Sequence, residues 1–326
     1  MGPSYGSSEG GASVQAALRA LRESGVAGHA PQLTLEAQRT PDDAPRLEGA
    51  APVETNGVEV RPVPGTPEAG FVAFLDGIQR SRVLAHVGGV PLVHGAVAAA
   101  VRQRVDRRPR TWETPIRSQR LYAPLALLDP ALVRALGDQV ALRDTAVAED
   151  AGAALQHPQE HTARALTAVQ REREAVELAL VGAWVQRGPG PLLVDGGISG
   201  SAEGARSDRV VGVVKSHRTL YADAAGLPRV LGLREGERTT AVQLHSPRRH
   251  PVASWYLRLR EPVTRGPLFG LVRVEVALGM DLTARADRVS RWLLAERAPV
   301  SLPDARWDVM VYGVRECEQY LSAILR

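Results

Sequence analysis

Two aspartates stand out because each follows a short apolar run and precedes glycine. The stretch FVAFLDG places Asp76 before Gly77, and PLLVDGG places Asp195 before a glycine pair. An apolar run closed by a turn signal predicts a buried strand, and an acid at its end would lie at the rim of a sheet, where ligand sites collect. Either aspartate alone could simply cap a following helix. Two of them, about 120 residues apart in the chain, predict paired carboxylates that bind a divalent metal ion.

Other acids could complete such a site. Glu174 and Glu177 lie one turn apart in a segment with helical periodicity that leads directly into the Asp195 strand. Charged residues on such a helix usually face water. Glu177 stands between two apolar residues, which favours it, but Glu174 also remains a candidate. Further acids near the C-terminus are Asp304, Asp308, Glu316 and Glu318. Three or four carboxylates can hold two Mg²⁺ or Mn²⁺ ions about 3.5–4 Å apart, which clamp a phosphate and activate water for in-line attack.

The basic residues include a single lysine, Lys215, among the 40 lysines and arginines. A GC-rich genome explains the arginine bias, whereas a retained lysine indicates a role for a compact ammonium group. It could balance a phosphate oxygen or orient the nucleophilic water. We also expect Arg80, Arg82 and His217 to contact DNA, since they lie beside the acidic strand or beside Lys215. The alternative for such arginine runs is an ordinary solvated face.

The order of the elements predicts an α/β fold with an RNase H-like mixed central sheet flanked by helices. After the Asp76 strand, SRVLAHVGG and VPLVHGAVAAAVR predict a hairpin, and residues 130–187 predict a long helical insertion. After the Asp195 strand, a loop and VVGVVKSHRTLY predict a β-hairpin of two buried strands. TTAVQLHSP, ASWYLRLRE and LFGLVRVEVA predict further strands, and helices return from residue 281 onward.

The N-terminal part predicts a flexible arm rather than a domain. Residues 1–12 are rich in glycine and serine, and residues 13–24 show helical periodicity with Ser13 as the N-cap. Prolines then recur from residue 28 to residue 70, and GVEVRPVPG predicts an added edge strand. The predicted division is therefore an arm over 1–69 and a main domain over 70–326.

Composition narrows the class of protein. A formal net charge of +4 and a pI near 9.6 are compatible with a polyanionic partner. A single cysteine, Cys317, excludes an intrachain disulfide and a CxxC zinc site. No apolar run approaches the ~20 residues that span a bilayer. We therefore expect a cytoplasmic protein without membrane contact. The sequence also lacks a GxxxxGK[ST] phosphate loop and a GxSxG nucleophile elbow.

Taken in order, these motifs resemble the NurA nucleases. The shared order is a strand ending in DG, a hairpin, a helical region with an acidic helix, an LLVDGG strand, a VVGVVKS strand, an RVEV strand and an acidic C-terminal helix. NurA proteins are RNase H-like, PIWI-related nucleases that act with the hexameric HerA translocase in DNA end resection. The resemblance covers residues 70–326, and FLDG, LLVDGG and GVVKS match best.

The resemblance implies a metal-dependent DNA nuclease and assigns its residues. Asp76 and Asp195 match the strand aspartates that bind manganese or magnesium, and Glu177 matches the helical glutamate better than Glu174 does. The family tends to place a histidine near its C-terminal helix. Since no histidine follows His250 here, Asp308 is our candidate for the last metal ligand. The family usually has serine after its first DG, where this chain has an isoleucine.

The resemblance also implies how such a protein acts. The expected activity is 5′–3′ exonuclease, with single-strand endonuclease activity as a further option, and Lys215 would join the acids in catalysis. The expected partners are DNA, a HerA-type hexameric translocase ATPase and a second copy of the chain in a homodimer. The helix over 13–24 could then dock on the translocase. Two other interpretations remain open, a catalytically weak nucleic-acid-binding adaptor of a DNA motor and a sugar kinase or phosphotransferase on a related sheet.

Overall fold

The computed structural model describes residues 10–25, 45–106, 108–147, 157–247, 249–262, 266–297 and 312–325. Its strands are β1 (Arg46–Glu48), β2 (Ala51–Pro52), β3 (Val60–Pro62), β4 (Ala73–Val87), β5 (Val90–Val105), β6 (Arg108–Ala123), β7 (Leu142–Asp144), β8 (Leu192–Asp195), β9 (Val210–Val214), β10 (Thr219–Tyr221), β11 (Glu237–Thr239), β12 (Val242–Ser246), β13 (Arg249–Arg258) and β14 (Leu271–Val276). Its helices are α1 (Gly10–Glu23), the 3-10 turn η2 (Leu125–Leu127), α2 (Pro130–Gly137), α3 (Pro158–Arg187), α4 (Ala202–Arg206), α5 (Gly226–Leu231), α6 (Leu282–Glu296) and α7 (Tyr312–Ile324).

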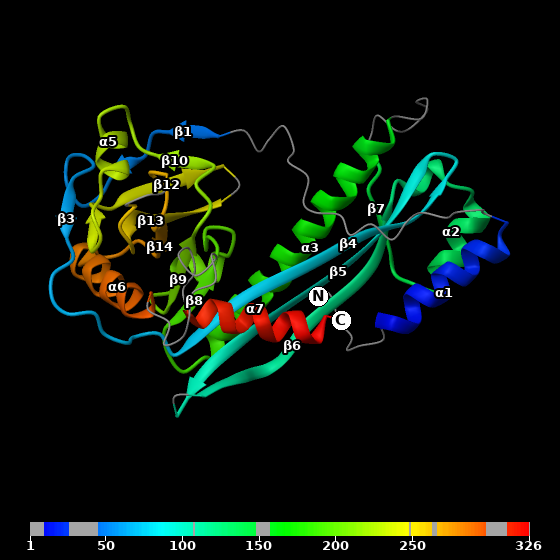
Figure 1. Ribbon diagram of the computed structural model, residues 1–326, viewed down its shortest axis with the longest axis horizontal. Helices are drawn as coiled ribbons and strands as arrows, with labels where there is room; N and C mark the ends of the chain where they lie inside the picture. Colours follow the sequence, from blue (N-terminus) through cyan, green and yellow to red (C-terminus); the bar gives the residue numbers. More distant parts are fainter. Residues whose placement is uncertain are drawn as a thin grey trace.

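One large mixed sheet organises the described residues (Figure 1). Its strand order is β2-β12-β13-β14-β9-β8-β4-β5-β6-β7, and β11 pairs with both β13 and β3. The strands β4, β5 and β6 are long and antiparallel, whereas β4 pairs with β8, and β8 with β9, in parallel. The predicted fold class, a mixed α/β sheet flanked by helices, is confirmed.

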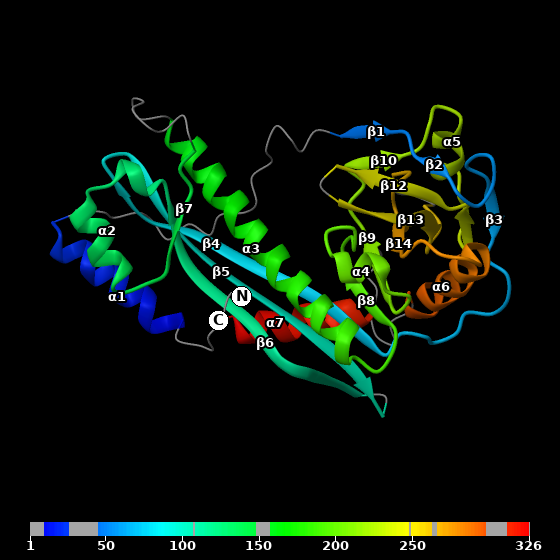
Figure 2. The same cartoon turned by 180° about the vertical axis from the view of Figure 1, so that it is seen from behind.

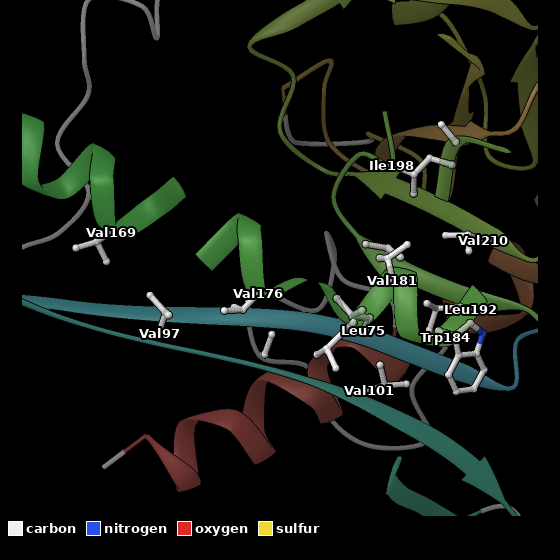
Figure 3. Packing of buried hydrophobic residues seen from close by; sticks show 14 of the residues in the cluster. Leu75, Val97, Val101, Val169, Val176, Val181, Trp184, Leu192, Ile198 and Val210 are labelled. Carbon is white, nitrogen blue, oxygen red and sulfur yellow. The ribbon is translucent and has the colours of Figure 1, made fainter. Parts of the chain in front are cut away.

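The long strands and α3 join two ends of an elongated molecule. Strands β10, β12 and β13 with α5 and α6 lie at one end, and α1, α2 and the short strand β7 lie at the other (Figures 1 and 2). Helix α3 crosses one face of the β4–β5–β6 sheet, and α7 lies on the opposite face. On the α3 side, Leu75, Val97 and Val101 of the sheet pack against Val176 and Trp184 (Figure 3).

Successive side chains of a strand point to opposite faces of the sheet, so the residues of β4 face α3 and α7 in turn. Leu75 belongs to the core cluster that contains α3, whereas Phe74 packs with Val314 and Cys317 of α7. The Cys317 thiol also lies 3.1 Å from the carbonyl oxygen of Phe74. Asp76 therefore points to the α7 face of the sheet.

Several sequence predictions about the fold are confirmed. The β4–β5 hairpin turns at Gly88 and Gly89, which both have positive φ (56° and 87°), as the primed turns of hairpins require. The strands around Asp195 and Lys215 and the later strands form as expected, as does the long helix that ends before Gly188. The lead-in also supplies the predicted edge strand, since β3 pairs with β11.

Three predictions about local structure are wrong. The Asp76 strand does not end at Gly77 but continues to Val87. The strands β8 and β9 do not form a hairpin; they are parallel, and the loop between them contains α4, whose N-cap Ser201 accepts a hydrogen bond from the backbone N–H of Gly204. Continuous apolar runs such as these two are typical of parallel strands, which are buried on both faces.

The third error concerns the helical region after residue 130. Helix α2 ends at Gly137, and residues Leu142–Asp144 form β7, which pairs in parallel with β6. The sequence had also given no sign of β6 itself. This strand is rich in arginine and contains Pro109 and Pro115. Before Leu121 it is paired only with β5, and its polar pattern is typical of a strand with one open side.

The segment before residue 70 also contributes to the structure. Strand β1 pairs in parallel with β10, and β2 pairs with β12. The side chain of Glu54 binds the fully buried Arg238, which also contacts Asp287 of α6. Helix α1 begins at Gly10, before the expected N-cap Ser13, and its Ala17 and Leu21 are buried beside α2. Strands β2 and β3 thus belong to the large sheet, and β1 forms a separate two-stranded sheet with β10.

Candidate functional site

The two predicted aspartates lie side by side on neighbouring parallel strands. Leu75 of β4 pairs with Val194 of β8, so Asp76 and Asp195 are the next residues on each strand. By alternation they share a face, since Phe74 and Leu193 belong to the same core cluster on the α7 side. Strand β8 ends at Asp195, whereas β4 continues to residue 87. The two aspartates therefore lie at the end of β8, beyond which β4 has no partner on that side.

Lys215 binds one of these acids directly. It follows the last residue of β9, and its Nζ lies 2.7 Å from Oδ2 of Asp195. Both side chains are mostly buried, with 21% and 20% of their surface exposed. The ammonium also acts on Asp76, whose pKa it lowers. The single lysine of the chain thus places a positive charge beside both aspartates.

Glu177 approaches the same edge of β4 from the α3 side. A Cβ atom on Gly77 would lie 2.2 Å from Oε1 of Glu177, so the glutamate occupies the space that a side chain at position 77 would need. Arg173, one turn earlier on α3, donates a hydrogen bond to Oε1 of Glu177 and another to Gln79 of β4. Gly77 thus does not turn the chain; it makes room for a carboxylate beside the strand.

The environment disfavours ionisation of two of these carboxyl groups. Burial, followed by the charges of Asp195 and Glu177, raises the pKa of Asp76 to about 8, although Lys215 and the N–H of Gly77 oppose this. Burial also raises the pKa of Glu177 to about 7, against the charge and hydrogen bond of Arg173. Neighbouring carboxylates in a poorly solvated site repel each other in this way, and such groups are frequent at functional sites.

A metal ion would suit these groups in kind and charge. Carboxylate oxygens are the ligands that Mg²⁺ and Mn²⁺ prefer, and the charge of a cation would oppose the effects of burial and of neighbouring acids that together raise the pKa of Asp76. In the part of the chain that the structure describes, however, no three His, Cys, Asp or Glu side chains converge closely enough to hold one ion. Asp195 and Glu177 are instead directed at Lys215 and Arg173. The carboxylates are therefore the right kind of ligand for Mg²⁺ or Mn²⁺, but they are not arranged around one point as in a closed metal site.

The other predicted residues lie elsewhere. Arg80 donates hydrogen bonds to the carbonyl oxygens of Leu325 and Ser322, on the α7 side of the sheet. Arg82 is half-buried two residues further along β4, and its charge helps burial lower the pKa of His94 to about 4. Among the described residues, neither arginine forms a hydrogen bond or ion pair with Asp76, Asp195 or Glu177. Asp304 and Asp308 lie outside the described residues.

His217 and the other arginines of the first hairpin also hold the fold together. The Nε2 atom of His217 lies 2.8 Å from the carbonyl oxygen of Leu271, and burial lowers the pKa of this histidine. Arg102 binds Glu316 of α7, and Arg104 binds Glu296 of α6. These contacts attach helices to the sheet, which is the ordinary structural role of such side chains.

A cavity of about 790 Å³ adjoins the acids on the α3 side. Asp195 and Glu177 line it, as do residues of the loop after β8, of β10 and of the β12–β13 hairpin. Asp76 and Lys215 are not among its lining residues. The cavity therefore meets the acidic cluster at Asp195 and Glu177.

A buried ion pair below the loop after β8 was not foreseen from the sequence. The carboxylate of Glu275, on β14, accepts hydrogen bonds from the backbone N–H groups of Ile198 and Ser199 and from Arg273. A Cβ on Gly197 would lie 2.9 Å from this carboxylate. The sequence signal that could have indicated this ion pair is the alternation Arg-Val-Glu in an otherwise apolar strand. Glu275 fixes the loop that begins at Asp195.

Comparison with known protein families and with curated proteins does not assign this chain to a family. No protein-family model matches the chain, and no curated protein matches its sequence. Among the described residues, no helix combines the length and apolar character that crossing a membrane requires.

Proposed function

We propose that this protein is a metal-dependent DNA nuclease of the NurA type. The observation that supports it best is the pair Asp76 and Asp195 on adjacent parallel strands, with Lys215 bound to one of them and Glu177 opposite. Two strand aspartates with a nearby helical acid form the donor set of enzymes in which divalent ions assist phosphodiester hydrolysis.

The strand order supports the same proposal. Three antiparallel strands, β6, β5 and β4, are followed by β8 and β9, which run parallel to β4. An RNase H-like sheet has this arrangement, with its acids on the central strand and on the parallel neighbour. Fold likeness alone does not assign a reaction, so the acids carry the proposal and the strand order is secondary.

In this proposal Asp76, Asp195 and Glu177 hold the Mn²⁺ or Mg²⁺, and Asp308 is a further predicted ligand. The ion would supply a Lewis acid for the phosphate and a more acidic bound water. Lys215 neutralises Asp195 when the carboxylate has no cation of its own, and its ammonium can stabilise negative charge on a phosphate oxygen. The 5′–3′ polarity, the single-strand endonuclease activity, the homodimer and the HerA-type translocase remain parts of the prediction.

A second candidate is a nucleic-acid-binding adaptor with weak or no catalysis. The ion pairs Lys215–Asp195 and Arg173–Glu177 favour it, because they satisfy two of the three acids within the chain itself. In an adaptor, these pairs would persist in the presence of divalent ions, and no cleavage would follow.

The two candidates are separated by cleavage assays on linear and circular DNA, single- and double-stranded, with Mn²⁺, with Mg²⁺ and with a chelator. For the nuclease we expect metal-dependent degradation that Asp195→Asn reduces by ~10²-fold or more. The matched control is Asp208→Asn, an exposed acid in the same β8–β9 connection, which should retain wild-type activity. DNA binding without cleavage, with or without a translocase, would instead support the adaptor.

A further inference from the structure

The cavity beside Asp195 has lining groups that suit a nucleotide. Tyr221 of β10 lines it, and the guanidinium of Arg273 lies 5.0 Å from the centre of the tyrosine ring. Arg218, Arg249 and His250 are further lining residues. Aromatic rings with nearby arginines bind single-stranded nucleic acid by stacking with bases and by attracting phosphates.

Five arginines and four acids line the cavity, and one of these acids, Asp195, is paired with Lys215 from outside the lining, so basic groups are in excess. Glu177 binds Arg173, and Glu275 binds Arg273. Arg249 has a different environment: its Nη1 lies 3.4 Å from the hydroxyl of Ser199, and within the described residues it forms no ion pair with a carboxylate. It is therefore a cation beside the Asp195 loop that can receive a phosphate.

Two backbone N–H groups of the loop after β8 are already occupied and do not serve that phosphate. Glycine-rich turns often bind anions through successive backbone N–H groups, but here the carboxylate of Glu275 accepts those of Ile198 and Ser199. We therefore assign the phosphate to basic side chains of the wall, of which Arg249 contacts this loop through the hydroxyl of Ser199.

The size of the cavity limits what can enter. Its volume of about 790 Å³ lies within the ~300–1,000 Å³ of small-molecule sites, so a nucleotide or two can occupy it and a duplex cannot. Asp195 and Glu177 stand in its wall, so a strand that ends in the cavity would pass these acids as it leaves.

We propose that this cavity binds the terminal nucleotide of a single DNA strand, with the phosphate near Arg249 and the base beside Tyr221. The following phosphodiester then lies at Asp195. This inference rests on the proposed nuclease function for the choice of DNA, and it adds the substrate class: a single-stranded end, which a duplex must first be opened to provide.

The test measures binding separately from cleavage. The full chain carrying Asp195→Asn is titrated with a short labelled single-stranded oligonucleotide bearing a 5′-phosphate, with chelator present, and fluorescence anisotropy is read. We expect Tyr221→Ala, added to this background, to weaken binding on the order of ten- to a hundredfold. Arg249→Ala should weaken it and lower the salt-dependence slope by ~1. Arg206→Ala, an exposed arginine of α4 outside the cavity, is the matched control and should bind normally.

A cross-linking experiment locates the strand end. Oligonucleotides with 5-iodouridine at the terminal or at an internal position are irradiated on the protein, and the linked peptide is identified by mass spectrometry. Linkage of the terminal position to the peptide containing Tyr221 is the expected result. Linkage of the terminal position to α7 or β6, or unchanged binding in both cavity variants, would overturn the proposal. So would a deoxynucleoside monophosphate that binds as tightly as the oligonucleotide, since it would make the cavity a site for free nucleotides.

The two proposals fail in different ways. If no metal-dependent cleavage occurs but the cavity variants lose single-strand binding, the nuclease proposal fails and the strand-end site stands. If cleavage occurs but the cavity variants bind and cleave like the control, the strand-end site fails and the nuclease proposal stands.

Discussion

The contact between Gly77 and Glu177 can be tested by a single methyl group. In Gly77→Ala, the new Cβ would lie 2.2 Å from Oε1 of Glu177 and 2.8 Å from its Cδ and Cγ. Real Cβ contacts do not occur at such distances, so the carboxylate must move. It cannot do so freely, because Arg173 binds it and α3 packs along β4. The substitution should therefore displace the glutamate from the edge of β4 where Asp76 and Asp195 lie.

The expected energy is the balance of two effects. An extra methyl group in a packed site costs about 1–3 kcal/mol, whereas replacing glycine within a strand otherwise gains about 0.5–1 kcal/mol. We expect Gly77→Ala to lower the free energy of unfolding by about 0.5–2 kcal/mol. In the Gly77→Ala/Glu177→Ala double variant the clashing atoms are absent, so the two substitutions should couple favourably by about 1–2 kcal/mol.

Urea denaturation of the wild type, both single variants and the double variant gives this coupling without any assumption about function. Gly182→Ala is the matched control, because a Cβ at this α3 position meets no atom within 4 Å, and it should raise stability by about 0.5–1 kcal/mol. If Gly77→Ala were as harmless as the control and the double variant showed additive effects, Glu177 would not lie against β4. The assignment of Glu177 to the acidic cluster would then be wrong.

Three further predictions concern the acids and their cations. Because the pKa of Asp76 is raised to about 8, above its unfolded value of ~4, ionisation reduces stability as pH rises through that window. Asp76→Asn should therefore be more stable than the wild type at pH 8, and this advantage should be much smaller at pH 5; urea denaturation showing an equal difference at both pH values would contradict the shift. Lys215→Met should lower stability at pH 8 by about 1–3 kcal/mol by removing the partner of Asp195 and slow cleavage by ~10²-fold. Lys215→Arg should not restore cleavage, since a planar guanidinium does not replace a compact ammonium, and full activity in that variant would exclude a specific role for lysine. Glu177→Gln should slow metal-dependent cleavage by ~10²-fold while Glu174→Gln stays within about threefold of the wild type; equal losses would show that Glu174 shares the role.

Apolar runs and turn residues made much of the sheet predictable. The pattern FVAFLDG and the glycine pair at 88–89 depend on local physics, namely burial of alternate residues and the conformational freedom of glycine. Strand β6 was not predicted because most of its length, before Leu121, is paired only with β5, and a strand with one open side does not need an apolar pattern. The parallel pairing of β8 and β9 was not predicted, because strand direction depends on the path of the connecting segment, which a run of apolar residues does not specify.

The candidate site was predictable in its members but not in its geometry. Asp76, Asp195 and Lys215 could be selected from their residue types and neighbours, whereas their common face depends on the register between β4 and β8. The role of Gly77 was misjudged, because a glycine that makes room for a distant side chain has the same local sequence as one that turns the chain. Arg173 and Glu275 were missed for a similar reason: their partners, Gln79 on β4 and the loop after β8, are distant in the sequence.

A second buried cluster in the same protein differs from the acidic site in how its charges are balanced. Burial alone would raise the pKa of Glu54, but the hydrogen bond and charge of Arg238 and the N–H of Ala241 lower it to about 2. That network is balanced by its own cations and stabilises the ionised acid, as a purely structural network does. At the β4–β8 edge the opposite holds, since Lys215 is present and the pKa of Asp76 is still raised to about 8. Burial is the largest cause of that raised pKa, and the charges of Asp195 and Glu177 add to it. In the proposed nuclease, a divalent ion would supply the positive charge that the Glu54 network obtains from Arg238.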